Sequence, residues 1–329
     1  MEERFCQLLV QRKLHTLSST FRNPTEMFRT SPDFCKRIYG KRGKSEMDLN
    51  TAIRFAQLVN AAYAIPPNNL ASQIGKVINA GVGGTGKPYE VVATLYANDL
   101  ATDMNPERAN NTVSIGLVFQ VLGGGDAVIA LRGTEGILEW VQDAKFLSVP
   151  CPFLRSAGNT EDGFTAMYNS MVTGTTAGSP SVAKALPTLP WKNVVSSLTV
   201  CGHSLGGALA TLLALDLAAN ASAPFNTPAT YTYASPKVGD PGFVTIYDHV
   251  VPSTVRIANR MDLVPKLPLP PLYDHVLGLS ELNPVKLGIP PKVLVKFDIP
   301  CEHYLTSYVH LLSLAAGGTV MPLDPTCVP

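Results

Sequence analysis

Apolar residues recur along the chain with two different periods. Beyond residue 47 they return every three or four positions, which predicts an amphipathic helix that begins after a cap at Asn50. Shorter apolar runs at residues 90–99 and 112–133 predict strands, and the glycine-rich turn at residues 123–126 splits the second run into a hairpin. Downstream, strand-like runs alternate with helical segments. This order predicts the α/β class, with a mostly parallel central sheet and helices on both of its faces.

Polar residues gather where several predicted strands end. The four segments concerned are residues 130–134, 202–207, 235–240 and 258–262. The carboxyl ends of parallel strands share one edge of a sheet, and open α/β sheets bind their ligands outside that edge. We therefore expect one functional site that is built from these four segments.

Ser204 is the candidate nucleophile. It is the central residue of GHSLG, residues 202–206, between a short apolar strand and an apolar helix-forming run at residues 205–220. A sharp strand-to-helix turn raises such a serine hydroxyl above the sheet, and glycine two residues to either side avoids a steric clash. The alternative is a serine in a structural turn that is only rich in glycine. The strand before it and the buried helix after it favour the nucleophile.

A serine hydroxyl attacks only when a base removes its proton, and an acid must orient that base. In a fold of this type the acid and then the histidine follow the serine along the chain. Asp262 comes shortly after an apolar strand at residues 254–258 and is the candidate acid. Asp248 and Asp274 each stand directly before a histidine, and we interpret them as solvated charges.

His303 is the candidate base. It follows a strand-like run and a proline, so we expect it in a loop that enters a helix, where catalytic groups are common. His310 lies seven residues further on, inside that helix, and is the alternative base. His203, beside the candidate nucleophile, is interpreted as a packing residue of the turn.

The reaction also needs donors for the negative charge that develops on the substrate oxygen. The backbone N–H of Leu205, at the start of the predicted helix, is one donor. The second is expected from Thr134, through its N–H and its hydroxyl, because its segment follows a neighbouring strand. Gly133 permits close approach of that backbone.

Five separated motifs occur in the order found in one protein family. They are RGT with the later EWVQDAKF, GHSLGGALA, YTYASPKVGD, NRMDLVPKLP and HYLTSYVH. Together they resemble the class 3 lipases, the fungal-lipase-like α/β hydrolases, over roughly residues 48–312. The resemblance implies an α/β-hydrolase fold. Carried over residue by residue, it implies that Ser204 is the nucleophile, Asp262 the acid and His303 the base. It also implies that Thr134 and Leu205 are the oxyanion donors.

The same resemblance implies an activity, hydrolysis of carboxylic esters through a Ser-Asp-His triad and an acyl-enzyme, with no metal and no cofactor. Triacylglycerol is the substrate expected first. A phospholipase, a feruloyl-type esterase or a peptidase on the same triad is the alternative among enzymes. A catalytically silent, lipase-like binding module is the other alternative, and three intact triad positions argue against it. The expected partner is a lipid or other ester, with transient contact with a lipid–water interface.

The family further implies a lid over the site. The matching segment, residues 135–146, is amphipathic, with Trp140 among its apolar residues. A short helix of this kind could cover an acyl groove in water and turn its apolar face to a lipid surface. The alternative is an ordinary surface helix with Trp140 in the core. Asp162 departs from the family pattern, in which a histidine is frequent at that position.

Composition narrows the class of protein. The 329 residues are 46% hydrophobic and 16% charged, which is enough apolar material for a large core. Residues 1–45 carry ten Lys/Arg and four Asp/Glu and predict a basic, disordered extension. Residues 46–329, with 16 Lys/Arg and 21 Asp/Glu, predict a single domain. A mildly acidic domain does not suit nucleic acid as its partner.

No targeting or membrane segment is expected. The apolar run at residues 5–10 is too short for a signal peptide, and the run at residues 205–219 is shorter than the roughly 20 residues of a membrane span. Cytoplasmic location is the default expectation, and export by another route stays open. The six cysteines form no zinc pattern, but Cys301 and Cys327 could pin the C-terminal tail.

Overall fold

A computed structural model describes the chain over residues 47–66, 68–69, 71–82, 86–99, 112–133, 146–175, 178–289 and 299–327. Contacts along the chain divide it into Met1–Met47 and Asp48–Pro329, and every element named below belongs to the second unit. The predicted extension at residues 1–45 lies outside the described residues. So do Thr134 and, apart from its last residue, the predicted lid with Trp140.

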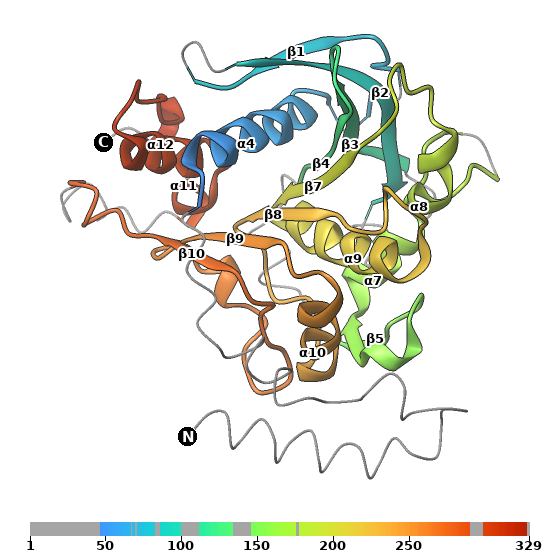
Figure 1. The fold of residues 1–329 in the computed structure, drawn as a ribbon. Helices are drawn as coiled ribbons and strands as arrows, with labels where there is room; N and C mark the ends of the chain where they lie inside the picture. The colour runs from blue at the N-terminus through green and yellow to red at the C-terminus, as the bar shows by residue number, and fades with distance from the viewer. Residues whose placement is uncertain are drawn as a thin grey trace, which may run out of the picture. The chain divides into compact units, whose positions relative to one another are not determined.

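An eight-stranded sheet in the order β1-β2-β3-β4-β7-β8-β9-β10 forms the centre of this unit (Figure 1). Its strands are β1 (Val77–Ala80), β2 (Lys87–Asn98), β3 (Thr112–Val121), β4 (Asp126–Leu131), β7 (Ser197–His203), β8 (Ala229–Tyr233), β9 (Thr254–Asn259) and β10 (Leu279–Leu282). From β4 to β10 neighbouring strands run parallel, and from β1 to β4 they run antiparallel. A separate two-stranded sheet pairs β5 (Ser148–Pro150) with β6 (Asn159–Glu161).

Helices cover both faces of the large sheet. They are α4 (Leu49–Tyr63), α7 (Asp162–Asn169), α8 (Val182–Ala185), α9 (Leu205–Asn220), α10 (Pro241–Val250), α11 (Ile299–His303) and α12 (Leu305–Ala316). Short 3-10 turns are η3 (Arg155–Ala157), η4 (Leu186–Thr188), η5 (Val264–Lys266) and η7 (Pro325–Cys327). In Figure 1, α4 and α12 lie together on one face, and α9 lies on the other with α7 and α10. The α/β fold with helices on both faces is thus confirmed.

The sequence pattern explains the most buried helix. Almost every residue of α9 from Leu205 to Leu217 is buried, and its apolar residues surround the whole axis. A helix that is apolar on all sides must be enclosed, and α9 packs against β7 and β8 beneath the sheet. This enclosure fixes the first turn of α9 at the carboxyl end of β7.

Helix α4 begins two residues earlier than the cap expected at Asn50. Its N-cap is Asp48, whose backbone is extended and whose carboxylate accepts a hydrogen bond from the N–H of Asn50 at 3.1 Å. A second bond to that carboxylate comes from the hydroxyl of Thr51. Since a carboxylate at the N-cap also favours the helix dipole, Asp48 is the better cap.

The parallel strands β4, β7, β8 and β9 end at one edge of the sheet. Their last residues are Leu131, His203, Tyr233 and Asn259. The four polar segments expected to build one site begin at or just after these ends, so the topology brings their described residues to the same edge (Figure 1).

Candidate active site

Ser204 is the single residue between the end of β7 and the start of α9. Its backbone has φ 58° and ψ −128°, a conformation that L-residues with side chains rarely adopt. The flanking glycines explain how the turn fits. A Cβ on Gly202 would lie 2.0 Å from the carbonyl oxygen of Gly206, and a Cβ on Gly206 would lie 2.4 Å from that of Leu131. Both positions therefore require glycine, because a side chain at either one would collide with a backbone carbonyl.

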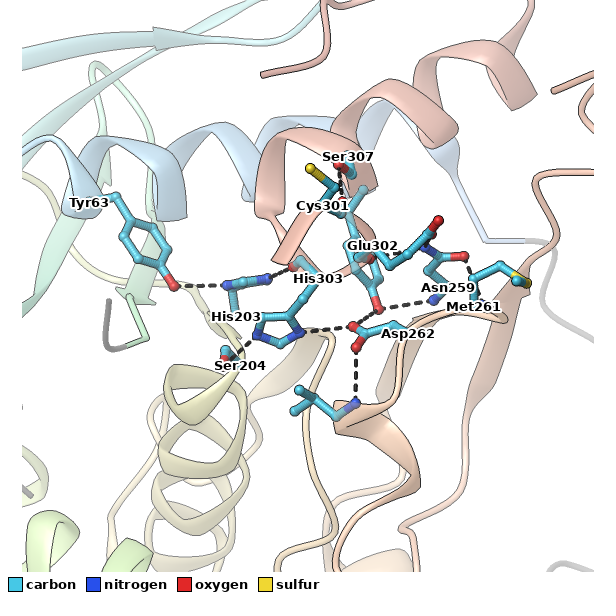
Figure 2. Close-up of polar contacts among 12 residues, drawn as sticks. Tyr63, His203, Ser204, Asn259, Met261, Asp262, Cys301, Glu302, His303 and Ser307 are labelled. Carbon is cyan, nitrogen blue, oxygen red and sulfur yellow. Dashed lines mark hydrogen bonds and ion pairs between the residues drawn. The ribbon is translucent and has the colours of Figure 1, made fainter. Parts of the chain in front are cut away.

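The three predicted triad residues meet in a continuous hydrogen-bonded chain (Figure 2). His303 Nε2 lies 2.8 Å from Ser204 Oγ, and His303 Nδ1 lies 2.9 Å from Asp262 Oδ2. The exposed fractions of Ser204, Asp262 and His303 are 1%, 1% and 3%. A buried serine thus contacts a histidine whose second nitrogen contacts a buried carboxylate.

The sequence predicted His303 in a loop, but His303 is the last residue of helix α11. The five-residue helix ends there and α12 begins two residues later, so the imidazole projects from a break between two helices. His310 lies inside α12, and its Nδ1 is 2.7 Å from the carbonyl oxygen of Met321. The structure therefore brings His303, and not His310, to Ser204.

The carboxylate of Asp262 is held from three directions. Besides His303, it accepts the N–H of Val264 on Oδ1 at 2.9 Å and the hydroxyl of Tyr308 on Oδ2 at 2.8 Å. Burial, and next the charge of Asp262, raise the pKa of Tyr308 well above its usual value. Its hydroxyl consequently keeps its proton and remains a donor to the carboxylate.

Asn259 ties the end of β9 to the helices that carry His303 and Tyr308. Its backbone N–H donates to the hydroxyl oxygen of Tyr308 at 3.0 Å. Its side-chain amide donates to the backbone carbonyl of Glu302 at 3.0 Å and to the carboxylate of Glu302 at 2.8 Å. Burial raises the pKa of that Glu302 carboxyl group. Strand β9 and helices α11 and α12 are thereby joined beside the triad.

Of the two predicted oxyanion donors, the structure describes Leu205. The N–H of Leu205 belongs to the first turn of α9, where amides have no partner within the helix. Thr134 lies outside the described residues, but Gly133 before it is described. A Cβ on Gly133 would lie 2.7 Å from the Tyr63 hydroxyl and 2.9 Å from Ser204 Cβ, so this backbone segment passes directly against the turn.

Sequence reasoning missed Tyr63, Asn259 and Tyr308, and it interpreted His203 only as packing. Tyr63 contacts a histidine 140 positions away, so no local spacing indicates that contact. Tyr308 does lie in the HYLTSYVH motif, at the i+5 position from His303, but the motif alone does not say that the hydroxyl points at Asp262. The imidazole of His203 makes two polar contacts and is therefore more than a packing group.

Metal-binding clusters and membrane-spanning helices are both absent from the described residues. In these ranges no group of three or more His, Cys, Asp or Glu side chains is arranged to hold a metal ion. None of the described helices is long and apolar enough to cross a membrane.

The model of the family described as "Lipase (class 3)" matches residues 128–271, a range that begins within β4 and contains Ser204 and Asp262. The chain belongs to the class 3 lipases. The family acts on lipid esters, so family membership supports a lipase-type carboxylic ester hydrolase. His303 lies beyond the matched range.

Named relatives of this class 3 lipase come from plants. It is 29% identical over 323 residues to "Phospholipase A1-II 6" of Oryza sativa subsp. japonica, covering 83% of this chain and 77% of that one. It is 32% identical over 256 residues to "Phospholipase A1-II 4" of the same subspecies, covering 70% and 63%. The match to "Phospholipase A1-II 1" of Oryza sativa subsp. indica, 31% identical, spans 41% of that relative.

Solved structures of fungal lipases have the same fold. The non-glycosylated LIP2 lipase of Yarrowia lipolytica matches with a TM-score of 0.52 at 20% identity, covering 71% of this class 3 lipase and 79% of that chain. A mutant form of MDLA from Penicillium cyclopium matches with a TM-score of 0.51 at 22% identity, covering 72% and 81%. At these identities the likeness establishes the α/β-hydrolase fold alone.

Proposed function

We propose that Ser204, His303 and Asp262 act as nucleophile, base and orienting acid in the hydrolysis of carboxylic esters. The observation that carries the proposal is the unbroken chain from Ser204 Oγ to His303 Nε2 at 2.8 Å and from His303 Nδ1 to Asp262 Oδ2 at 2.9 Å. A nucleophile bonded to a base that is bonded in turn to an acid is the arrangement that activates a serine hydroxyl.

In the proposed reaction, Ser204 Oγ attacks the ester carbonyl carbon while its proton passes to His303 Nε2. The carbonyl oxygen becomes an oxyanion, which the N–H of Leu205 and a donor from Thr134 stabilise. The carbon–oxygen bond to the leaving alcohol then breaks, and that alcohol takes the proton from Nε2. A water molecule, deprotonated by the same nitrogen, attacks the acyl-enzyme. Its collapse returns the proton to Ser204 and releases the carboxylic acid.

The role proposed for Asp262 fixes the tautomer of His303. For Nε2 to accept the serine proton, the proton of the neutral imidazole must reside on Nδ1, which faces Asp262 Oδ2. Tyr308 and Val264 also donate to this carboxylate and hold its plane. A carboxylate fixed in this way stabilises the imidazolium that forms when His303 takes the proton. Every step uses only side chains, backbone amides and water.

For the substrate we propose a diacyl phospholipid in preference to the triacylglycerol expected from the sequence. The support is that the relatives matched over most of this chain are called phospholipase A1. Triacylglycerol is the second candidate, because the family acts on lipid esters in general. A feruloyl-type esterase or a silent lipid-binding module are the other outcomes that the experiment separates.

The test compares three substrates and two variants. We expect the wild-type protein to release fatty acid from phosphatidylcholine vesicles faster than from emulsified triacylglycerol, and to leave methyl ferulate unchanged. Ser204→Ala should lower turnover by at least about 10³-fold, since the nucleophile is lost. Ser197→Ala is the matched control, because Ser197 begins β7, the strand that leads to Ser204, and its hydroxyl donates to the exposed Asp126.

The outcomes divide the possibilities. If folded Ser204→Ala protein keeps its turnover, another group is the nucleophile and the proposed triad is wrong. If folded wild-type protein hydrolyses none of the three esters, the silent binding module replaces the enzyme. Faster hydrolysis of triacylglycerol would reverse the substrate preference and leave the triad intact.

A further inference from the structure

A second hydrogen-bonded chain crosses the site behind the triad (Figure 2). The N–H of Gly133 donates to the hydroxyl oxygen of Tyr63 at 2.8 Å. That hydroxyl lies 2.8 Å from His203 Nδ1, and His203 Nε2 lies 2.7 Å from the backbone carbonyl oxygen of His303. One path thus links the backbone beside the predicted oxyanion donor Thr134 to the backbone of the proposed base.

The direction of every bond in this chain follows from its two ends. A carbonyl oxygen only accepts, so the nitrogen that faces His303, Nε2 of His203, must carry a hydrogen. Burial lowers the pKa of His203 well below its usual value, so this imidazole is neutral. A neutral imidazole with its hydrogen on Nε2 has an acceptor at Nδ1. The Tyr63 hydroxyl therefore donates to His203 and accepts from Gly133.

The surroundings keep these groups in place. His203 is 3% exposed, and its ring packs edge-on against Tyr63 with the centroids 5.8 Å apart. The guanidinium of Arg132 lies 5.8 Å from the centroid of the Tyr63 ring, within range of a cation–π contact. Tyr63 is the last residue of helix α4. The hydrogen-bonded chain therefore connects the site to the helix that lies on the opposite face of the sheet from α9 (Figure 1).

We propose that Tyr63 and His203 are positioning residues, which hold the backbones of Gly133 and His303 at a fixed separation across Ser204. The inference rests on the proposed function, because it assigns a role around the same triad. The N–H of Gly133 donates to the Tyr63 hydroxyl and is not one of the proposed oxyanion donors. This bridge, formed by Tyr63 and His203, thereby fixes the described backbone of Gly133 relative to that of His303.

The bridge matters because the reaction needs both sides of the site at once. The base must reach Ser204 while the oxyanion donors face the substrate oxygen, and a misplacement of about 1 Å can cost 10²-fold in rate. Neither Tyr63 nor His203 touches the reacting atoms in this scheme. Their loss should therefore reduce kcat far more than it changes KM.

The first experiment replaces the Tyr63 hydroxyl alone. We expect Tyr63→Phe to lower kcat on phosphatidylcholine by about 10- to 100-fold while KM changes less than about 3-fold. Tyr233→Phe is the matched control: it also removes a tyrosine hydroxyl that bonds a backbone group, the carbonyl of Ala52 in α4, but this hydroxyl lies outside the bridge. That variant should keep kcat within about 2-fold, although it loses a buried hydrogen bond of the same kind.

The second experiment tests the order of the bridge. In His203→Gln the terminal amide can still donate to the His303 carbonyl, but the ring nitrogen Nδ1 that faces the Tyr63 hydroxyl is gone. The double variant with Tyr63→Phe should then be hardly slower than His203→Gln alone, since the same bond is already broken. Nitrogen-15 NMR of histidine-labelled Ser204→Ala protein should find the hydrogen of His203 on Nε2 at neutral pH.

Three results would overturn the bridge. They are Tyr63→Phe protein with the kcat of the control variant, kcat losses that multiply in the double variant, and a His203 hydrogen on Nδ1. The NMR measurement needs no turnover, so it tests the bridge even if the wild-type protein hydrolyses no ester. Absence of activity in the wild type would instead count against the proposed function.

Discussion

At the scale of single residues, the turn around Ser204 depends on the absence of side chains. A methyl group at residue 206 would lie 2.4 Å from the carbonyl oxygen of Leu131 and 2.6 Å from that of Arg132, and backbone cannot move aside cheaply. We expect Gly206→Ala to lower the free energy of unfolding by about 3 kcal/mol, or to prevent folding. Gly124→Ala is the control, because the nearest atom to its methyl would be a Val121 side-chain carbon at 3.3 Å, and the nearest backbone atom would lie 3.9 Å away. Denaturant titration of both variants measures the difference, and equal stabilities would contradict the packing argument.

Single residues also mark what the sequence can and cannot predict. Ser204, Asp262 and His303 could be selected because acyl transfer requires those residue types at strand ends in that order, and the structure brings them together. Tyr63 and Asn259 could not be selected in the same way. Tyrosine and asparagine occur in many roles, and only the folded chain reveals that these two face the site.

At the scale of elements, a disulfide joins the C-terminal tail to the helix that carries His303. It links Cys301 on α11 to Cys327 in η7, 26 positions away. We expect the double variant Cys301→Ser/Cys327→Ser to be less stable than the wild type by about 3 kcal/mol, because the cross-link restricts the unfolded chain. Thermal unfolding with and without reductant measures this. Reductant should lower the Tm of the wild type only, and an equal fall in the variant would contradict the assignment.

Elements with a strong pattern were predicted better than elements set by distant contacts. The apolar period predicts α4, and the glycine-rich turn predicts the β3–β4 hairpin, because both signals are local. Residues 263–289, after Asp262, gave no such signal, and the strand-like run expected before His303 lies largely outside the described residues. Strand β10 has only four residues and pairs with β9 through a parallel ladder, so its existence depends on a neighbour distant in sequence. Helix α11 is likewise too short to have a period of its own.

At the scale of the whole molecule, buried histidines should make the stability depend on pH. Burial, and next the charge of Arg256, lower the pKa of His275 from 6.5 to about 3, and its Nε2 donates to the carbonyl of Pro265. Below about pH 6.5 His275 binds a proton in the unfolded chain but stays neutral in the folded protein. The free energy of unfolding therefore falls as the pH falls. Between pH 6.5 and 5 this histidine alone should cost about 2 kcal/mol.

The variant His275→Gln isolates that contribution. Glutamine keeps an N–H for the carbonyl of Pro265 but has no proton to gain, so the pH dependence should become shallower by the same amount. Denaturant titrations of both proteins at pH 6.5 and pH 5 measure the difference. Parallel curves for the two proteins would mean that His275 is protonated in the folded state as readily as in the unfolded state.

The central claim, that Ser204 is the nucleophile of this class 3 lipase, has one most direct test. The folded wild-type protein is treated with an alkyl fluorophosphonate, which reacts with activated serines, and its peptides are analysed by mass spectrometry. The account predicts one stoichiometric phosphonate adduct, on the peptide that contains Ser204, and none on that site in Ser204→Ala or after His303→Ala. An adduct on a different serine, or no adduct on folded wild-type protein, would contradict it.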